Sequence, residues 1–226
     1  MNASEPLVRC IGAARTYGRG GAATVALEPT DCEVLPGARV ALMGPSGSGK
    51  STLLHLMAGL DDPTLGIVEW PAIGGREALR PGPVGIVFQG PSLLPPLTVE
   101  ENVALPRILA GESDRSAHAE ARSSLELLEL LELADKLPEE ISGGQAQRVA
   151  VARAVTGDPR LILADEPTGQ LDQANGHAVV DVLLAAAEHT GAALVIATHD
   201  TRVAERLPER WQMVSGSLRT REQVPA

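Results

Sequence analysis

One glycine-rich segment constrains the fold of this chain more than any other. It follows the apolar run 39–43 and precedes the helix-like segment 52–58, so the order is strand, turn and helix. Glycines at this spacing let backbone N–H groups turn inward around phosphate oxygens, and the helix N-terminus adds a partial positive charge. The pattern is that of a phosphate-binding P-loop. The segment reads Gly44-Pro45-Ser46-Gly47-Ser48-Gly49-Lys50-Ser51.

Two side chains at the end of this segment complete a site for a nucleotide and a metal ion. Lys50 would reach the β- and γ-phosphates, and the Ser51 hydroxyl would face Mg²⁺. The chain has seventeen arginines but only two lysines, Lys50 and Lys136, so one of them stands where the chemistry requires a lysine. A flexible Gly/Ser linker is the alternative, but a linker would not separate an apolar strand from an apolar helix with lysine and serine in register.

The composition is that of a globular protein. The 226 residues are enough for one large domain, or for a domain with a subdomain, and 44% of them are hydrophobic. The formal net charge of −10 argues against broad electrostatic binding to DNA or to an anionic membrane. The chain is therefore expected to have no nucleic-acid partner.

The cysteines and the N-terminus indicate a reducing compartment. Cys10 and Cys32 lie on apolar, strand-like segments without metal-ligand spacing, so we expect reduced thiols in the core. Residues 1–6 contain no basic region followed by an apolar stretch, and no apolar run reaches the roughly eighteen residues of a membrane span. We therefore expect a cytosolic chain whose contact with a membrane is made through a partner.

Strand and helix patterns alternate along most of the chain, which predicts an α/β fold with a parallel sheet covered on both faces. The central part, from about residue 90 to 158, is instead rich in leucine and predicts an inserted α-helical subdomain. Within it, leucines at helical spacing predict a helix over 123–137 with its glutamates facing solvent. Strands are predicted over 7–14, 24–34, 39–43, 67–70, 84–88, 161–164, 192–197, 212–214 and 217–219, and helices over 52–58, 178–189 and 201–207.

A P-loop needs a second carboxylate to hold the metal, and this carboxylate should end a buried strand. Asp165 and Glu166 directly follow the apolar run 161–164. Asp165 would hold the metal through water, and Glu166 could polarise the water that attacks the γ-phosphate. The alternative is a helix N-cap followed by a first-turn charge, which we would favour if the P-loop were absent.

Two further features carry less specific signals. Tyr17 is the only tyrosine, and the residues leave two interpretations open: a strand-end residue that caps the core, or an aromatic platform for a nucleotide base. Ser142-Gly143-Gly144-Gln145 opens a helix and forms a second anion-binding end. By itself this would be an ordinary capped turn. Because one chain needs one γ-phosphate cradle for one nucleotide, the second should serve the ATP of another chain.

These motifs, in this order, resemble the nucleotide-binding subunit of ABC transporters over essentially the whole chain. The resemblance implies a single ATPase domain, residues 1–226, with a P-loop NTPase core, N-terminal antiparallel strands and a helical subdomain. The RecA-like core would comprise residues 1–89 and 159–226, and the subdomain about 90–158. It implies ATP and Mg²⁺ as ligands and ATP hydrolysis as the reaction.

The resemblance also implies roles for individual residues. Tyr17 matches the aromatic residue that stacks on adenine, Asp172 the loop that crosses the dimer interface, and His199 the switch histidine that contacts the γ-phosphate. Gln89 matches the glutamine that links Mg²⁺ and the attacking water to the transmembrane partner. Ser142 to Gln145 match the signature, which is preceded by Ile141 where leucine is usual. The implied ATP-binding residues are Tyr17 and Gly44 to Thr52, the catalytic residues are Lys50, Gln89, Glu166 and His199, and the metal ligands are Ser51, Gln89 and Asp165.

A finer resemblance concerns the branch of the family. The segments 93–95, 98–103 and 165–172 are similar to those of the lipoprotein-release, macrolide-export and cell-division ATPases, although Gln170 stands where asparagine is usual. The resemblance implies a head-to-tail dimer, or a pair with a related subunit, that drives a separate transmembrane permease in efflux or extraction. It also implies a peripheral location on the cytoplasmic face of a cell membrane, and the excess of arginine over lysine indicates a bacterial source.

Three other functions use parts of the same sequence pattern. An ATPase that signals through a membrane complex without moving a solute remains open, because both functions engage a membrane helix near Gln89. A nucleic-acid ATPase would need a long inserted coiled coil or a second such domain, and the sequence has neither. A P-loop kinase would have no use for the signature or for the pair Asp165 and Glu166. The transported substrate should be determined by the partner.

Overall fold

The computed structural model describes residues 5–90 and 92–223, which form two compact units. The first unit takes the described residues of Met1–Leu79, Leu163–Glu166 and Ala193–Ala226, and the second takes those of Arg80–Ile162 and Pro167–Ala192. The division into a core of 1–89 and 159–226 with a helical part over 90–158 stays a prediction.

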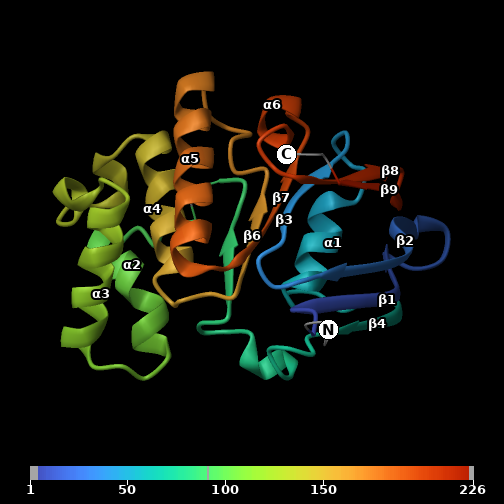
Figure 1. Cartoon of the computed structure of the whole chain (residues 1–226), viewed down its shortest axis with the longest axis horizontal. Helices are drawn as coiled ribbons and strands as arrows, with labels where there is room; N and C mark the ends of the chain where they lie inside the picture. The colour runs from blue at the N-terminus through green and yellow to red at the C-terminus, as the bar shows by residue number, and fades with distance from the viewer. Residues whose placement is uncertain (1–4, 91, 224–226) are drawn as a thin grey trace. The chain divides into compact units, whose positions relative to one another are not determined.

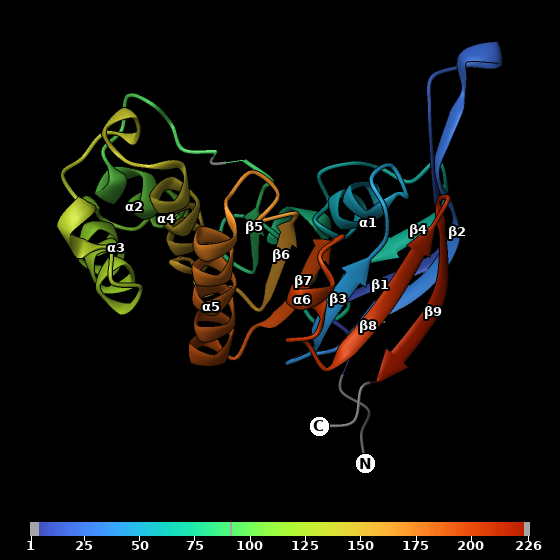
Figure 2. The same cartoon turned by 90° about the horizontal axis from the view of Figure 1, so that it is seen from above.

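An antiparallel sheet forms one part of the first unit, with the strand order β2-β1-β4. Its strands are β1 (Val8–Tyr17), β2 (Thr24–Val34) and β4 (Leu65–Glu69), and η1 (Gly20–Ala22) lies in the turn of the β1–β2 hairpin (Figure 2). The first strand was predicted to end at Ala14, but pairing with β2 extends it to Tyr17, which lies opposite Thr24. Cys10 and Cys32 lie opposite each other on β1 and β2, and both are buried, as predicted for core thiols.

A second sheet carries the parallel strands of the first unit (Figure 1). Strand β3 (Arg39–Met43) lies between β7 (Ala193–Thr198) and β8 (Glu209–Val214) and is parallel to both. Strand β9 (Ser217–Gln223) runs antiparallel to β8, so the strands predicted over 212–214 and 217–219 form a hairpin. Strand β6 (Leu161–Asp165) is the neighbour of β7, and every one of its residues is buried.

Besides η1, the described part of this unit contains three helical segments. They are α1 (Lys50–Met57), η2 (Arg76–Ala78) and α6 (Thr201–Ala204). Helix α1 contacts β1, β2 and β7, so it packs against strands of both sheets. Its buried residues Leu53, Leu54, Leu56 and Met57 supply this packing, and Lys50 is buried at its first turn.

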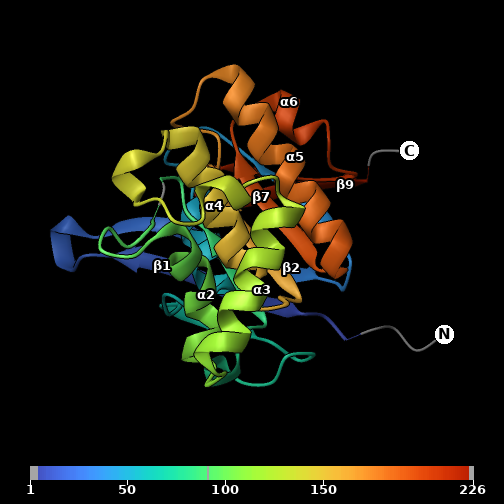
Figure 3. The ribbon, with the colours of Figure 1, turned by 90° about the vertical axis from the view of Figure 1, so that its left-hand side faces the viewer.

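The second unit is mainly helical (Figure 3). Four helices form its frame, and α4 contacts α2, α3 and α5. Strand β5 precedes them in the chain and also packs on α4, where Gly85 leaves no room for a Cβ against Ala154. The elements of this unit are β5 (Val84–Val87), α2 (Val99–Leu109), α3 (Asp114–Leu127), η3 (Leu131–Leu133), η4 (Pro138–Glu140), α4 (Gly143–Val155) and α5 (Gln173–Thr190).

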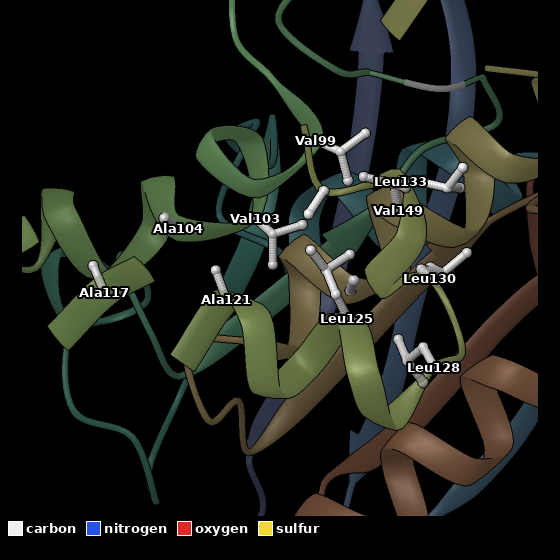
Figure 4. Packing of buried hydrophobic residues seen from close by; sticks show 12 residues of the cluster. Val99, Val103, Ala104, Ala117, Ala121, Leu125, Leu128, Leu130, Leu133 and Val149 are labelled. Carbon is white, nitrogen blue, oxygen red and sulfur yellow. The ribbon is translucent and has the colours of Figure 1, made fainter. Parts of the chain in front are cut away.

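Small and branched apolar side chains fill the space between α2, α3 and α4. Figure 4 shows Val103, Ala121 and Leu125 pointing toward one another, and each of them is fully buried. The alanines allow the helices to approach closely, and the leucines fill the remaining volume. This cluster confirms the predicted leucine-rich helical region without any aromatic residue.

The predicted helix over 123–137 is wrong in its extent. Helix α3 begins at Asp114 and ends at Leu127, and Glu129 then adopts a left-handed backbone with φ of 55°. The chain turns there so that Leu128, Leu130 and Leu133 all enter the core cluster. In a continuous helix, Leu128 and Leu130 would point to different faces and could not both be buried in this cluster. Burial of leucines from several directions therefore outweighs local helical spacing.

The helices offer no candidate for a membrane span: in the ranges 5–90 and 92–223, none is both long enough and apolar enough. The sequence predicts no leader segment, and part of this prediction rests on residues 1–4. These residues lie outside the described residues.

We expect Leu125→Ala to destabilise the protein by about 2–5 kcal/mol, because it removes buried methyl groups and leaves a cavity among α2, α3 and α4. Leu127→Ala is the matched control, since Leu127 lies on the same helix and is 46% exposed. The control should change stability by no more than about 0.5 kcal/mol. Urea unfolding followed by circular dichroism measures both, and equal losses would contradict the assigned core.

Candidate functional site

The glycine-rich loop connects the end of β3 at Met43 to the start of α1 at Lys50. Pro45, Ser46 and Gly47 are exposed in its middle, and Thr52 lies in the first turn of α1. The loop is anchored near its end, where the N–H of Gly216 donates to the Ser48 carbonyl at 2.9 Å. The Ser48 hydroxyl is buried and has no hydrogen-bond partner among the described residues, which suits a site built to receive an oxygen-rich ligand.

Two of the glycines are required by close backbone contacts. Gly49 caps α1 with a left-handed φ of 102°, and a Cβ at this position would lie 2.5 Å from the carbonyl oxygen of Ala26 on β2. A Cβ at Gly44 would lie 2.5 Å from the carbonyl oxygen of Met213 on β8. The loop is thus held between β2 and β8, which explains why the sequence needs glycine at both ends.

Lys50 is the buried cation of the site, with 4% exposure. Its Nζ donates to the carbonyl oxygens of Gly44 at 2.8 Å and Pro45 at 3.1 Å, and lies 3.0 Å from Glu166 Oε1. A buried ammonium group needs such partners, because the loss of hydration would otherwise be costly. The structure therefore places the positive charge inside the loop and directly beside the acidic pair.

Asp165 lies at the end of β6 and accepts a hydrogen bond from the Ser51 hydroxyl at 2.9 Å. Burial raises the pKa of Asp165, although the hydrogen bond from Ser51 and the positive charges nearby act in the opposite direction. His55 Nε2, on the next turn of α1, is 4.0 Å from the other carboxylate oxygen. Ser51 and Asp165 therefore present two oxygen ligands side by side.

These two oxygen atoms fit a magnesium ion. Mg²⁺ prefers hard oxygen ligands and is usually held by one or two protein groups together with phosphates and water. Within 5–90 and 92–223, no cluster of three or more histidine, cysteine, aspartate or glutamate side chains could hold a metal by itself. Ser51 and Asp165 thus suit a metal that arrives with a phosphate ligand.

Glu166 has the least relaxed backbone in the site, with φ of 45°. This conformation is unfavourable for a residue with a Cβ, and it is supported by a hydrogen bond from its own N–H to the Ala197 carbonyl oxygen at 2.9 Å. It turns the two neighbouring carboxylates in different directions. The Asp165 carboxylate accepts from the Ser51 hydroxyl, and the Glu166 carboxylate lies beside Lys50 Nζ. The second oxygen of Glu166 lies 2.7 Å from Nδ1 of His199, which follows β7.

Tyr17 lies at the end of β1 and is 41% exposed, so it is not a core residue. Its hydroxyl donates to Asp61 Oδ2 at 2.9 Å, and the guanidinium of Arg15 lies 4.8 Å from the centre of its ring. Of the two interpretations left open by the sequence, the exposed aromatic platform agrees with this placement.

The remaining predicted site residues belong to the second unit. Ser142 caps α4, where it accepts from the Gln145 N–H at 3.2 Å while its own N–H donates to Gln145 Oε1 at 2.8 Å. Asp172 caps α5 and accepts from the Asn175 N–H at 3.0 Å. Gln89 is exposed, two residues after the end of β5. The structure therefore confirms the predicted helix start at the signature, and the roles of these residues stay predictions.

The sequence-based predictions do not include two contacts of this unit, which are made by the polar side chains of Gln147 and Asn175. Gln147 on α4 is 1% exposed and donates to the carbonyl oxygen of Phe88, the residue before Gln89, at 2.8 Å. Asn175 lies against Gly144, where a Cβ would be 2.8 Å from its Oδ1. Gln147 thereby ties the signature helix to the segment of Gln89, and Asn175 ties it to the cap of Asp172. A glutamine between buried positions of an amphipathic helix was the available signal for Gln147.

Comparison with known proteins agrees with this geometry. A family model described as "ABC transporter" matches residues 27–169. The lipoprotein-releasing system ATP-binding protein LolD of Legionella pneumophila (strain Paris) is 43% identical over 215 residues, which are 92% of this chain and 95% of the relative. The LolD protein of Shewanella oneidensis is 39% identical over 225 residues, with 96% and 98% covered.

A solved structure is similar over nearly the same length. The dimeric structure of a post-hydrolysis state of the ATP-binding cassette MJ0796, bound to ADP and Pi, superimposes with a TM-score of 0.87 at 35% identity. The similarity covers 97% of this chain and 99% of that one. The fold is therefore shared with an ATP-binding cassette.

We expect Gly49→Ala to destabilise the chain by at least about 2 kcal/mol, because it adds a steric clash with Ala26 to the cost of a left-handed backbone. Gly47→Ala is the matched control: its φ of 76° is also left-handed, but no atom lies within 4 Å of the added Cβ. The control should cost about 1 kcal/mol. Chemical denaturation measures the difference, and equal costs would show that the loop does not pack on β2.

Proposed function

Because this chain belongs to the ABC transporter family of ATP-binding proteins, we propose that its ATP hydrolysis drives a membrane protein partner in the release of lipoproteins from a membrane. The chain is an ATPase subunit. The observation that carries the proposal is the arrangement of Lys50, Asp165 and Glu166 around the glycine-rich loop. The release of lipoproteins is proposed from the names of the relatives.

Binding of the triphosphate would use the loop and Lys50. The backbone N–H groups and the dipole of α1 attract the phosphate oxygens, and Lys50 adds a full positive charge. A γ-phosphate near Lys50 Nζ would compete with Glu166 Oε1, which lies 3.0 Å away. This exchange would free the Glu166 carboxylate to face a water molecule when the nucleotide is bound.

Hydrolysis would then depend on Glu166 and His199. Glu166 would orient the attacking water and accept its proton, which is the role of a general base in phosphoryl transfer. His199 Nδ1 would hold the other carboxylate oxygen at 2.7 Å and keep the group in position. Ser51, Asp165 and Gln89 would hold Mg²⁺, and the bound ion would supply positive charge for the phosphates. Positioned charges of this kind stabilise the loose transition state.

The active form would be a pair of chains. One chain contains one P-loop but a second capped helix start at Ser142 to Gln145, which would contact the ATP bound by the other chain. Asp172 would lie in the loop that crosses the interface. Support comes from the ATP-binding cassette MJ0796, which was solved as a dimer.

The partner would be a separate transmembrane permease, and the chain would act on the cytoplasmic face of a bacterial membrane. Gln89, exposed after β5 and linked to α4 through Phe88 and Gln147, would carry the state of the ATP site to that partner. The two LolD relatives named above come from bacteria.

We expect Glu166→Gln to lower steady-state ATP turnover by at least about a hundredfold, because it removes the general base. ATP binding should persist, since Lys50 keeps its loop carbonyl partners. Glu188→Gln, at an exposed position near the end of α5, is the control and should hydrolyse ATP like the wild type. Phosphate release and equilibrium ATP binding are the two measurements. A normal rate for Glu166→Gln would remove Glu166 from the proposed role.

The partner is tested by purifying the tagged chain from its native membranes in mild detergent and identifying the proteins that accompany it. We expect a multi-spanning protein that raises the ATPase rate and, in vesicles loaded with a lipoprotein, ATP-dependent release of that lipoprotein. Stimulation without release would contradict lipoprotein release and favour the signalling function. Recovery of the chain without any membrane protein would contradict the transporter function itself.

A further inference from the structure

The ring of Tyr17 is held by two charged side chains of the first unit. Its hydroxyl donates to Asp61 Oδ2 at 2.9 Å, and Arg15 Cζ lies over the ring at 4.8 Å from its centre. Arg15 and Asp61 also bind each other, through Nε to Oδ2 at 2.9 Å and through a second guanidinium nitrogen to Oδ1 at 2.7 Å. The three side chains thus form a closed set of contacts in which each one restrains the other two.

This set is rigid for a group so near the surface. The Arg15 and Asp61 side chains are 23% and 22% exposed, and two parallel contacts between guanidinium and carboxylate fix the orientation of both planes. Burial by itself would raise the pKa of Asp61, but hydrogen bonds from the Asp62 N–H and Tyr17 hydroxyl and the charge of Arg15 hold it below the ordinary value. Asp61 therefore stays ionised as a partner for both residues at neutral pH.

The backbone holds the same region in place. Asp61 lies in the turn that leads to β4, and the Thr64 N–H of this turn donates to the Ala14 carbonyl oxygen of β1 at 2.7 Å. Tyr17 pairs with Thr24 on β2, two residues before Ala26, whose carbonyl oxygen would lie 2.5 Å from a Cβ at Gly49 of the phosphate-binding loop. Strand β2 therefore leads from the partner of Tyr17 to a close approach with the loop.

We propose that Arg15 and Asp61 are positioning residues that hold the ring of Tyr17 in the orientation in which it stacks on the base of the nucleotide. This inference rests on the proposed function, in which Tyr17 is the platform for adenine. Arg15 occupies one face of the ring through a cation–π contact, and the residue still keeps 41% of its surface exposed for a ligand.

A simple structural role explains the set less well. A tyrosine that only fills a strand end would be buried against apolar neighbours, whereas Tyr17 is exposed and its side chain contacts the charged groups of Asp61 and Arg15. An exposed tyrosine without restraints would also lose rotational freedom when a base stacks on it. Holding the ring beforehand avoids this loss, which corresponds to about a three- to tenfold gain in affinity for one ordered side chain.

The test compares two ligands that differ in the presence of a base. Binding of Mg²⁺ with the non-hydrolysable analogue AMPPNP, and of Mg²⁺ with inorganic tripolyphosphate, is measured by calorimetry on the full chain. We expect Arg15→Met to weaken AMPPNP binding about three- to tenfold and to leave tripolyphosphate binding unchanged. Arg15→Lys, which keeps a cation near the ring, should recover part of the loss.

The chain offers a matched control on the same strand. Arg9 on β1 also forms an exposed ion pair, with Glu33 at 2.6 Å, and Arg9→Met should bind both ligands like the wild type. Asp61→Asn provides a second, milder variant, because its amide oxygen can still accept from Tyr17 while the ion pair with Arg15 is lost. It should weaken AMPPNP binding in the same selective way, and melting curves verify that each variant is folded.

Tyr17→Ala separates the inference from the proposed function. We expect it to weaken AMPPNP binding selectively, and adding Arg15→Met to it should cause no further loss, because the ring that Arg15 holds is gone. If Tyr17→Ala weakens AMPPNP binding but Arg15→Met and Asp61→Asn do not, the positioning role is wrong and the platform stands. If Tyr17→Ala has no effect, the platform itself is wrong. Equal losses for both ligands in Arg15→Met would also overturn the inference, since they would indicate a general structural role.

Discussion

The site depends on the burial of a single lysine. Lys50 is almost fully removed from solvent, so its charge must be met by the carbonyl oxygens of its own loop and by Glu166. These partners can surround it only if the loop folds tightly and if β6 ends beside it. The glycines at 44 and 49 meet the first requirement, because the backbones of β8 and β2 leave no space for a Cβ. The left-handed backbone of Glu166, directly after β6, meets the second requirement, because it lets the Glu166 carboxylate lie beside Lys50.

Within the first unit, the same contacts connect nucleotide chemistry to the antiparallel sheet. The loop lies against β2 at Ala26, β2 pairs with β1 as far as Tyr17, and Tyr17 is held by Arg15 and Asp61. Phosphate and base would thus be received by parts of one hydrogen-bonded framework. In the second unit, Gln147 and Asn175 perform a similar task, since they tie the signature helix to the segments of Gln89 and Asp172. Each unit therefore contains its own set of side chains that hold the proposed functional segments.

The differences between prediction and structure have a common physical cause. The leucine pattern over 123–137 fits one helix, but the side chains of 128, 130 and 133 are buried only if the chain leaves the helix after Leu127 and turns at Glu129. The first strand likewise continues to Tyr17 because β2 provides partners for it. In both places the outcome depends on segments that are distant in the sequence. The local spacing of residues in the sequence therefore does not determine where this helix and this strand end.

The sequence by itself determined the class of fold, the position of the glycine-rich loop and the residues for which we propose a chemical role. It did so because these properties depend on local order: an apolar strand, a glycine-rich turn with lysine and serine, and carboxylates directly after a strand. Only the tertiary structure decided which side chains hold that chemistry in place. Arg15 and Asp61 are 46 positions apart, and Phe88 and Gln147 are 59 apart, so neither contact has a local pattern. These contacts exist because folding brings distant polar groups together, and a polar group that loses part of its hydration needs a partner.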